Sequence, residues 1–147
     1  MKIFLFALML LIGVVLSLHL SMNAQVGAII KNPKVANAVF WVIGALTAVC
    51  VGLVSFEPEA LSRTREVPWW LLTAGAIGAL LVFGIAWTMP QIGAGAAFVL
   101  MIAGQVITGM LMSHYGLLGS PVQPVTLTKL AGVALLLAGV AVFVYSK

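Results

Sequence analysis

The sequence predicts an all-α integral membrane protein whose five transmembrane helices form a single domain, residues 1–147. Hydrophobic residues make up 63% of the chain, charged residues only 7%, and the mean hydropathy is +1.23. A soluble domain of ordinary composition carries about 25% charged residues. The run 67–128 contains no Asp, Glu, Lys or Arg. That run is long enough for two membrane crossings, because each crossing needs about 20 apolar residues.

The first predicted span covers residues 3–30 and the second covers 35–56. The first apolar stretch resembles a secretory signal peptide, but apolar residues resume at 26–30, so we expect the segment to be retained as a helix. Pro33 follows a short polar loop and indicates where the second helix begins. The second half of the first span is unusually polar, with Ser17, His19, Ser21, Asn23 and Gln25.

The charge-free run predicts a helical hairpin made of spans 68–88 and 91–113. We place the turn between them at 88–91, since Pro90 disfavours helical backbone at the residue before it. All the acidic residues of the chain lie in segment 57–67, which we read as a loop that precedes the hairpin.

The fifth predicted span, 127–145, carries small residues seven positions apart. Small residues allow helix backbones to approach closely in lipid, and a heptad spacing places them in one stripe. We therefore expect this stripe to form a subunit interface. Its members are Ala131, Gly132, Ala138 and Gly139.

The basic residues are almost evenly divided between the two sides of the membrane. An excess of Lys and Arg on one side is what normally fixes the orientation of a membrane protein. We therefore expect insertion in both orientations, or orientation by a partner; the alternative is one orientation set by the early lysine pair. Two opposite orientations can pair as an inverted repeat with a binding site near the midplane. Five spans put four cations on one side and three on the other, namely Lys2, Arg63, Arg65 and Lys129 against Lys31, Lys34 and Lys147.

Polar side chains inside the spans are candidate binding residues, because an unpaired polar group in hydrocarbon is costly. Gln105 lies near the middle of the fourth span, and Thr108 lies on nearly the same face. They either contact a substrate in a central cavity or bond helix to helix. His19 and Asn23 are i,i+4 neighbours in the first span. An imidazole has an ordinary pKa of about 6.5, so His19 either carries a coupling proton or stays neutral and bonded to a neighbouring helix.

The four tryptophans fall near the ends of predicted spans. This is the distribution of interfacial anchors, and substrate stacking by any one of them is the alternative. They are Trp41, Trp69, Trp70 and Trp87.

Enzyme, metal and nucleic-acid functions find no support in the residue pattern. No predicted span contains Asp or Glu, and no nucleophile–base constellation or phosphate-binding loop is present. Cys50 is the single cysteine, so there is no metal-ligand spacing. The net charge of +4 is scattered rather than gathered on a face. We expect no catalytic activity, no cofactor, no metal and no nucleic-acid partner.

A series of short motifs gives the chain a recognisable pattern. The motifs are Asn23, Pro68-Trp69-Trp70, Gly75, Gly78, Pro90-x-x-Gly93, Gly104-Gln105, His114-Tyr115-Gly116-Leu117-Leu118, Gly132 and Leu135-Leu136-Leu137-Ala138-Gly139. With them the chain resembles the short five-span, YdcZ-type members of the drug/metabolite transporter superfamily, which are related to the EamA-type halves of ten-span transporters. It departs from that pattern at His19, where Gln is expected, at Gln91, where a basic residue often stands, and at Ser113, where Asp is usual.

The resemblance implies a multi-pass protein of the bacterial inner membrane related to exporters of metabolites and drugs. In the ten-span relatives the first, third and fourth helices of each half line the cavity. We therefore expect an exporter of a small neutral, zwitterionic or weakly basic molecule, working by alternating access as an antiparallel homodimer or a paralogue heterodimer. The alternative is a non-transporting membrane subunit that stabilises or orients a paralogous partner. Carried over to this chain, the resemblance selects His19, Asn23, Trp87, Gln105 and Thr108 as substrate-contacting residues.

Overall fold

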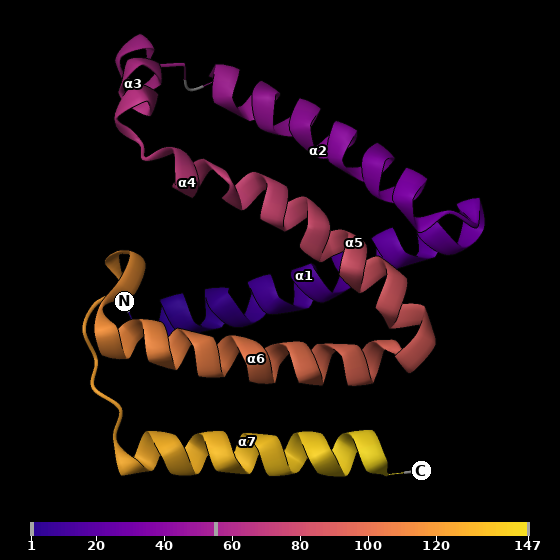
Figure 1. Ribbon diagram of the computed structural model, residues 1–147, viewed down its shortest axis with the longest axis vertical. Helices are drawn as coiled ribbons and strands as arrows, with labels where there is room; N and C mark the ends of the chain where they lie inside the picture. Colours follow the sequence, from indigo (N-terminus) through magenta and orange to yellow (C-terminus); the bar gives the residue numbers. More distant parts are fainter. Residues whose placement is uncertain (1, 55, 147) are drawn as a thin grey trace. The chain divides into compact units, whose positions relative to one another are not determined.

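The computed structural model describes residues 2–54 and 56–146, and its long elements are all helices (Figure 1). Within these residues, five helical segments are long and apolar enough to cross a membrane. An all-α membrane protein with five spans is thereby confirmed. Ser55, in the predicted second span, and Lys147, in the charge count, lie outside the described residues. The five segments are α1 (Lys2–Ile30), α2 (Pro33–Val54), α4 with α5 (Trp69–Ile92), α6 (Ala94–Tyr115) and α7 (Leu127–Tyr145).

The chain divides into two compact units, Met1–Gln91 and Ile92–Lys147. The single domain expected from the sequence stays a prediction. Large apolar side chains cover the outside of the spans in both units, as a lipid environment requires. The first unit adds to α1 and α2 the elements α3 (Pro58–Arg63), η1 (Thr64–Glu66), α4 (Trp69–Leu72) and nearly all of α5 (Ala74–Ile92), and the second contains α6, η2 (Leu117–Gly119) and α7.

In the first unit, α1 and α2 form a hairpin whose turn consists of Lys31 and Asn32. Lys31 adopts a left-handed conformation (φ 56°) that ends α1. The Oδ1 atom of Asn32 accepts hydrogen bonds from the backbone N–H groups of Lys34 and Val35, at 3.1 and 3.3 Å, and so caps α2. Pro33 suits the first helical position because a backbone N–H there would have no helical partner. The helix start indicated by Pro33 is confirmed.

The turn predicted at 88–91 lies instead at Gly93. Helix α5 continues through Pro90 and ends at Ile92, so the backbone hydrogen bond that proline removes is lost only in the last turn of the helix. Gly93 adopts φ 83° and ψ 149°, a conformation that residues with a side chain rarely adopt. The chain therefore turns at the glycine, and α6 begins at Ala94 rather than at Gln91.

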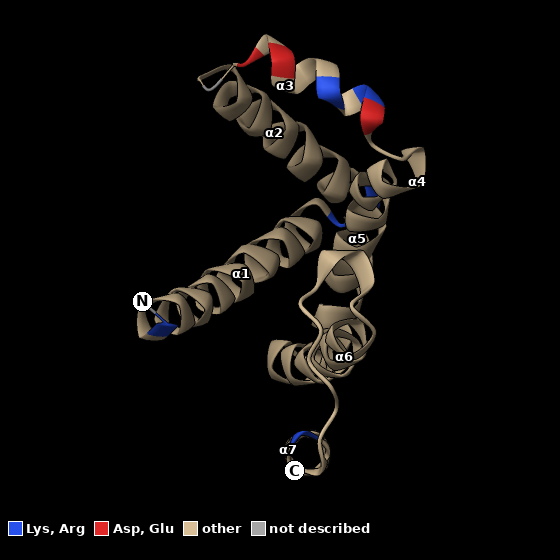
Figure 2. Cartoon of the chain, turned by 90° about the vertical axis from the view of Figure 1, so that its left-hand side faces the viewer, with Lys and Arg blue, Asp and Glu red and all other residues tan. Residues whose placement is uncertain are grey.

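The charged segment 57–67 is more ordered than a loop. It contains the short helix α3, which begins with Pro58, followed by the single turn η1. Arg63 and Glu59 form an exposed ion pair one helical turn apart, with 3.7 Å between Nη2 and Oε2. Figure 2 shows acidic positions at both ends of this segment and basic positions between them. Proline at the start and charge pairing along one face explain why the segment is helical.

In the second unit, α6 and α7 lie side by side, joined by the α6–α7 connection, residues 116–126 (Figure 1). Gly116 ends α6 in a left-handed conformation (φ 64°) and its N–H donates to the carbonyl of Met112. A Cβ atom at this position would lie 2.9 Å from Cγ2 of Val122. Both the backbone angle and the close approach of the connection therefore require glycine.

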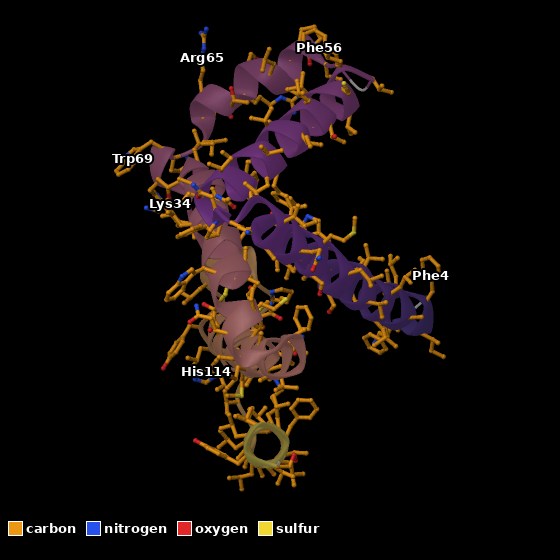
Figure 3. All side chains as sticks on the ribbon, turned by 90° about the vertical axis from the view of Figure 1, so that its right-hand side faces the viewer. Phe4, Lys34, Phe56, Arg65, Trp69 and His114 are labelled. Atoms are coloured by element: carbon orange, nitrogen blue, oxygen red, sulfur yellow. The ribbon has the colours of Figure 1, made fainter. Side chains whose placement is uncertain are left out.

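Two hydrogen bonds attach the α6–α7 connection to the end of α6. The backbone N–H of Gln123 donates to the carbonyl of Ser113 at 2.8 Å, and the N–H of Val125 donates to Nδ1 of His114 at 3.1 Å. Figure 3 labels His114 near the end of α6. Because Nδ1 accepts a hydrogen bond, it carries no hydrogen in this arrangement. The His114-Tyr115-Gly116 motif thus has a structural role, which is to fold the connection back onto α6.

Replacing His114 by Leu should release the connection from α6, whereas Asn should retain it. The Oδ1 atom of Asn can take the place of Nδ1 as an acceptor, and Leu has no acceptor. A neutral hydrogen bond contributes about 1 kcal/mol, so we expect amide exchange at Val125 to be roughly fivefold faster in His114→Leu and near the wild-type rate in His114→Asn. Hydrogen–deuterium exchange mass spectrometry on the purified protein measures this. Unchanged exchange in His114→Leu would contradict the role given to this imidazole.

Candidate functional site

A cavity of about 420 Å³ lies between α1 and α2. The two helices diverge from their shared turn (Figures 1 and 3), and the cavity occupies the space between their facing sides. Its lining is mostly apolar, and His19 and Asn23 provide the polar side chains. The lining residues are Val15, Leu18, His19, Met22, Asn23 and Val26 from α1, and Ala36, Val39, Phe40 and Ile43 from α2.

Small residues close the α1–α2 cavity next to the turn. Ala36 is fully buried, and a Cβ atom at Gly27 would lie only 3.7 Å from Cα of Pro33 and 3.9 Å from Cβ of Ala36. Small residues allow helix backbones to approach in this way. The hairpin is therefore tight at its turn, and the cavity opens farther along the helices, where His19 and Phe40 face each other.

His19 lies on the open side of the cavity. Its side chain is exposed, and its ring packs against Phe40 with 4.8 Å between the ring centroids and an interplanar angle of 50°. A neutral imidazole offers one hydrogen-bond donor and one acceptor, and a protonated one offers two donors. The cavity therefore combines an aromatic wall with a group that can change its charge.

Asn23 is buried without a hydrogen-bond partner. Its side chain is 3% exposed, and neither Nδ2 nor Oδ1 has a partner among the described residues. An unpaired buried amide costs about 1–3 kcal/mol. It lies beside the buried Leu20 and Ala24 on α1, between the cavity and the core of the first unit. A molecule that enters the cavity and forms hydrogen bonds with the Asn23 amide would therefore remove this cost in stability.

A second polar pair, which sequence reasoning missed, lies on α2 against α5. Nδ2 of Asn37 donates to the carbonyl of Ala79 at 3.3 Å, while Oδ1 of Asn37 and Nε1 of Trp41 are buried without partners. The indole of Trp41 packs over Gly78, where a Cβ atom would lie 3.5 Å from Cη2. The indole of Trp41 therefore packs against α5, and its role as an interfacial anchor stays a prediction. The i,i+4 spacing of Asn37 and Trp41 was the signal available in the sequence.

In the first unit, α5 contacts both α1 and α2. Ser21 on α1 contacts Met89 on α5, with 3.9 Å between the hydroxyl oxygen and the sulfur. The residues buried on α1, α2 and α5 in this unit are Leu20, Asn23, Ala24, Gly27, Ala36, Val82, Ala86 and Met89. The three side chains that carry an unpaired polar atom among the described residues therefore belong to the same unit as this small core.

The other predicted site residues lie apart from the α1–α2 cavity or in the second unit. Trp87 on α5 is 57% exposed, and its carbonyl accepts a hydrogen bond from Nε2 of Gln91 at 2.8 Å. Gln105 and Thr108 are exposed on α6. The structure thus brings His19 and Asn23 together, while substrate contact by Trp87, Gln105 and Thr108 stays a prediction.

The predicted subunit interface on α7 is open surface within the second unit. Ala131, Gly132, Ala138 and Gly139 are all exposed. No described residue comes within 4 Å of a Cβ atom built on Gly132 or Gly139. The stripe is therefore accessible to another helix, and its use as an interface stays a prediction. Among the described residues, no cluster of three or more His, Cys, Asp or Glu could hold a metal ion.

Comparison with known proteins identifies a family whose model matches nearly the whole chain. Residues 4–142 match the family model described as "Putative inner membrane exporter, YdcZ". The match covers all five membrane-spanning segments almost completely. No curated protein and no solved structure gives a significant match.

Proposed function

The chain belongs to the YdcZ family of inner-membrane exporters, and from this premise we propose that it exports a small neutral, zwitterionic or weakly basic molecule. The observation that carries the proposal is the α1–α2 cavity, in which His19 lies at the opening and Asn23 lies buried and unpaired. Small-molecule sites have volumes of about 300–1,000 Å³ and few polar groups. The cavity meets both conditions with a volume of about 420 Å³.

We infer the charge of the substrate from the absence of acidic side chains in the described spans. None of the five membrane-spanning segments in the described chain contains Asp or Glu. A strong cation buried without a counter-charge is costly. An uncharged or zwitterionic head, or a weak base that sheds its proton, instead matches an amide and an imidazole. In this proposal Asn23 binds the polar head, Phe40 packs against the apolar part, and His19 binds substrate or the coupling proton.

We further propose that two chains in opposite orientations form the transporter and work by alternating access. The near-even division of basic residues supports this arrangement, and an inverted repeat places its binding site between the repeats. The small-residue stripe of Gly132 and Gly139 on α7 would hold the partner. Gln105 and Thr108, exposed on α6, would be further substrate-contacting residues. The simplest such dimer is a homodimer in the bacterial inner membrane. The alternative is a heterodimer with a paralogous chain.

One observation favours the rival function, a non-transporting subunit that stabilises a partner. Asn37 already uses its amide to bond α2 to α5, which is how a purely structural membrane bundle uses polar side chains. The two functions differ in what filling the α1–α2 cavity does, because only a transporter needs that space.

Val39→Trp should abolish export, whereas Val42→Trp should leave it unchanged. Val39 lines the α1–α2 cavity, and the indole would occupy that space. Val42 is on the same helix, is 60% exposed and does not line the cavity, so it is a matched control. We expect compounds enriched in the medium of cells that produce the wild-type protein to fall at least tenfold with Val39→Trp. Mass-spectrometric comparison of the media measures this.

The same experiment separates the two functions. If Val39→Trp is produced at the wild-type level and exports the same compounds equally well, the α1–α2 cavity is not the site. If the wild-type protein enriches no compound, with or without a co-produced paralogue, the accessory-subunit function replaces export.

Single cysteines on opposite sides should both be labelled from outside the cell, each in about half of the molecules. With Cys50→Ala as background, Ser62→Cys in α3 and Gln91→Cys at the end of α5 report the two sides without altering any charge. A membrane-impermeant maleimide on intact cells measures the labelled fraction. Asn32 is left unchanged because it caps α2.

The labelling has a control in the same cells, since lysis should expose both sites fully. If one site is labelled and the other is protected until lysis, a homodimer of opposite orientations is ruled out. The antiparallel partner would then have to be a different chain.

A further inference from the structure

A second cavity, of about 330 Å³, lies between α6, α7 and the α6–α7 connection. It belongs entirely to the second unit and is separate from the α1–α2 cavity. Its polar end is formed by Ser113, Gln123 and Lys129, and its apolar end by Val106, Met110 and Val133. Ser113 and Val106 are two helical turns apart on α6, so the cavity runs about 10 Å along the helix from polar to apolar lining.

The cation in this cavity, Lys129, has no acidic side chain as a partner among the described residues of its unit. Nζ of Lys129 donates to the carbonyl of Pro124 at 3.0 Å and more weakly to that of Gln123 at 3.5 Å. Residues 92–147 contain no Asp or Glu, so both partners of the ammonium group in this unit are neutral. The half-buried Lys129 is therefore held in a fixed place with its charge uncompensated, and its third N–H remains available.

The groups beside Lys129 complete a set of donors. Ser113 and Gln123 line the same cavity, and a hydroxyl and a side-chain amide can each donate to an anionic oxygen. The α6–α7 connection keeps Ser113, Gln123 and Lys129 together. The backbone N–H of Gln123 donates to the carbonyl of Ser113 at 2.8 Å, and Lys129 donates to the carbonyls of Gln123 and Pro124. An oxyanion is the ligand that one cation and two neutral donors suit best.

We propose that this cavity binds the phosphodiester headgroup of an anionic membrane phospholipid. The polar end lies where α6 ends and α7 begins, which is the depth of the lipid phosphates for two membrane-spanning helices. The apolar end lies deeper, where the upper part of an acyl chain would follow Val106 and Val133. Basic pockets between transmembrane helices bind lipid headgroups in this way. This site is independent of the substrate site and needs no transport activity.

Native mass spectrometry of the purified protein with added phosphatidylglycerol tests the proposal. We expect retained lipid adducts on the wild-type protein and on Lys129→Arg, and at least a fivefold loss with Lys129→Gln. Ser113→Asp should have the same effect, because it adds a carboxylate to the cavity that neutralises the charge of the Lys129 ammonium group. Lys34→Gln is the matched control, since it removes a cation near a helix end that lines neither cavity, and it should bind as the wild type does.

Several outcomes would overturn the site. Equal adducts for the wild type and Ser113→Asp would do so, and this variant decides the matter if Lys129→Gln fails to fold. Equal retention of phosphatidylcholine and phosphatidylglycerol would show that no anionic headgroup is selected. Displacement of the lipid by millimolar inorganic phosphate alone would show that the site binds free phosphate. Loss of adducts in Lys34→Gln would show that the lipid is held by the general positive charge of the surface and not by this cavity.

Discussion

A polar group that is surrounded by hydrocarbon must find a hydrogen-bond partner, and this constraint explains most of the structure. Helices satisfy the backbone of all five spans internally. The side chains that remain are few, and in the first unit three of them are buried without partners: Asn23, the Oδ1 of Asn37 and the Nε1 of Trp41. Each unpaired group lowers stability. We propose that a substrate that enters the α1–α2 cavity bonds to the Asn23 amide and so removes part of this cost.

The second unit meets the same constraint in a different way. His114, the carbonyl of Ser113 and the ammonium group of Lys129 all find partners in the α6–α7 connection. Gly116 allows the connection to approach so closely. Here polar groups hold a loop in place, and the charge of Lys129 is what remains for an outside molecule. Our two proposals assign a different role to each unit, with substrate binding in the α1–α2 cavity and lipid binding beside α7.

Local signals in the sequence were sufficient for the spans and for some of their ends. Apolar run length predicted five helices, and Pro33 and Leu127 marked the starts of two of them. The i,i+4 spacing of His19 and Asn23 also placed both on the lining of one cavity. The turn near Pro90 was misplaced, because a preference against helix before proline is weaker than the freedom of Gly93 to adopt a positive φ.

Tertiary contacts account for what the sequence could not predict. The packing of Trp41 over Gly78 of α5 and the hydrogen bond from Asn37 to the carbonyl of Ala79 join residues that are far apart in the sequence. Nothing local to residues 37–41 specifies which helix lies opposite. The cavity beside Lys129 likewise depends on how the α6–α7 connection folds back. The sequence therefore predicted where helices form, but not which helices pack against each other.

The most direct test of this account is the thermal unfolding of Asn23→Leu beside the wild-type protein in the same detergent. Leucine has the same number of heavy side-chain atoms as asparagine and no polar ones, so it removes an unpaired amide from a buried position that borders the α1–α2 cavity. We expect the unfolding midpoint of Asn23→Leu to be equal to or above that of the wild type. A midpoint lower by several degrees would show that the Asn23 amide is bonded within the resting protein. Asn23 would then be a packing residue, and the α1–α2 cavity would lose the group that identifies it as a binding site.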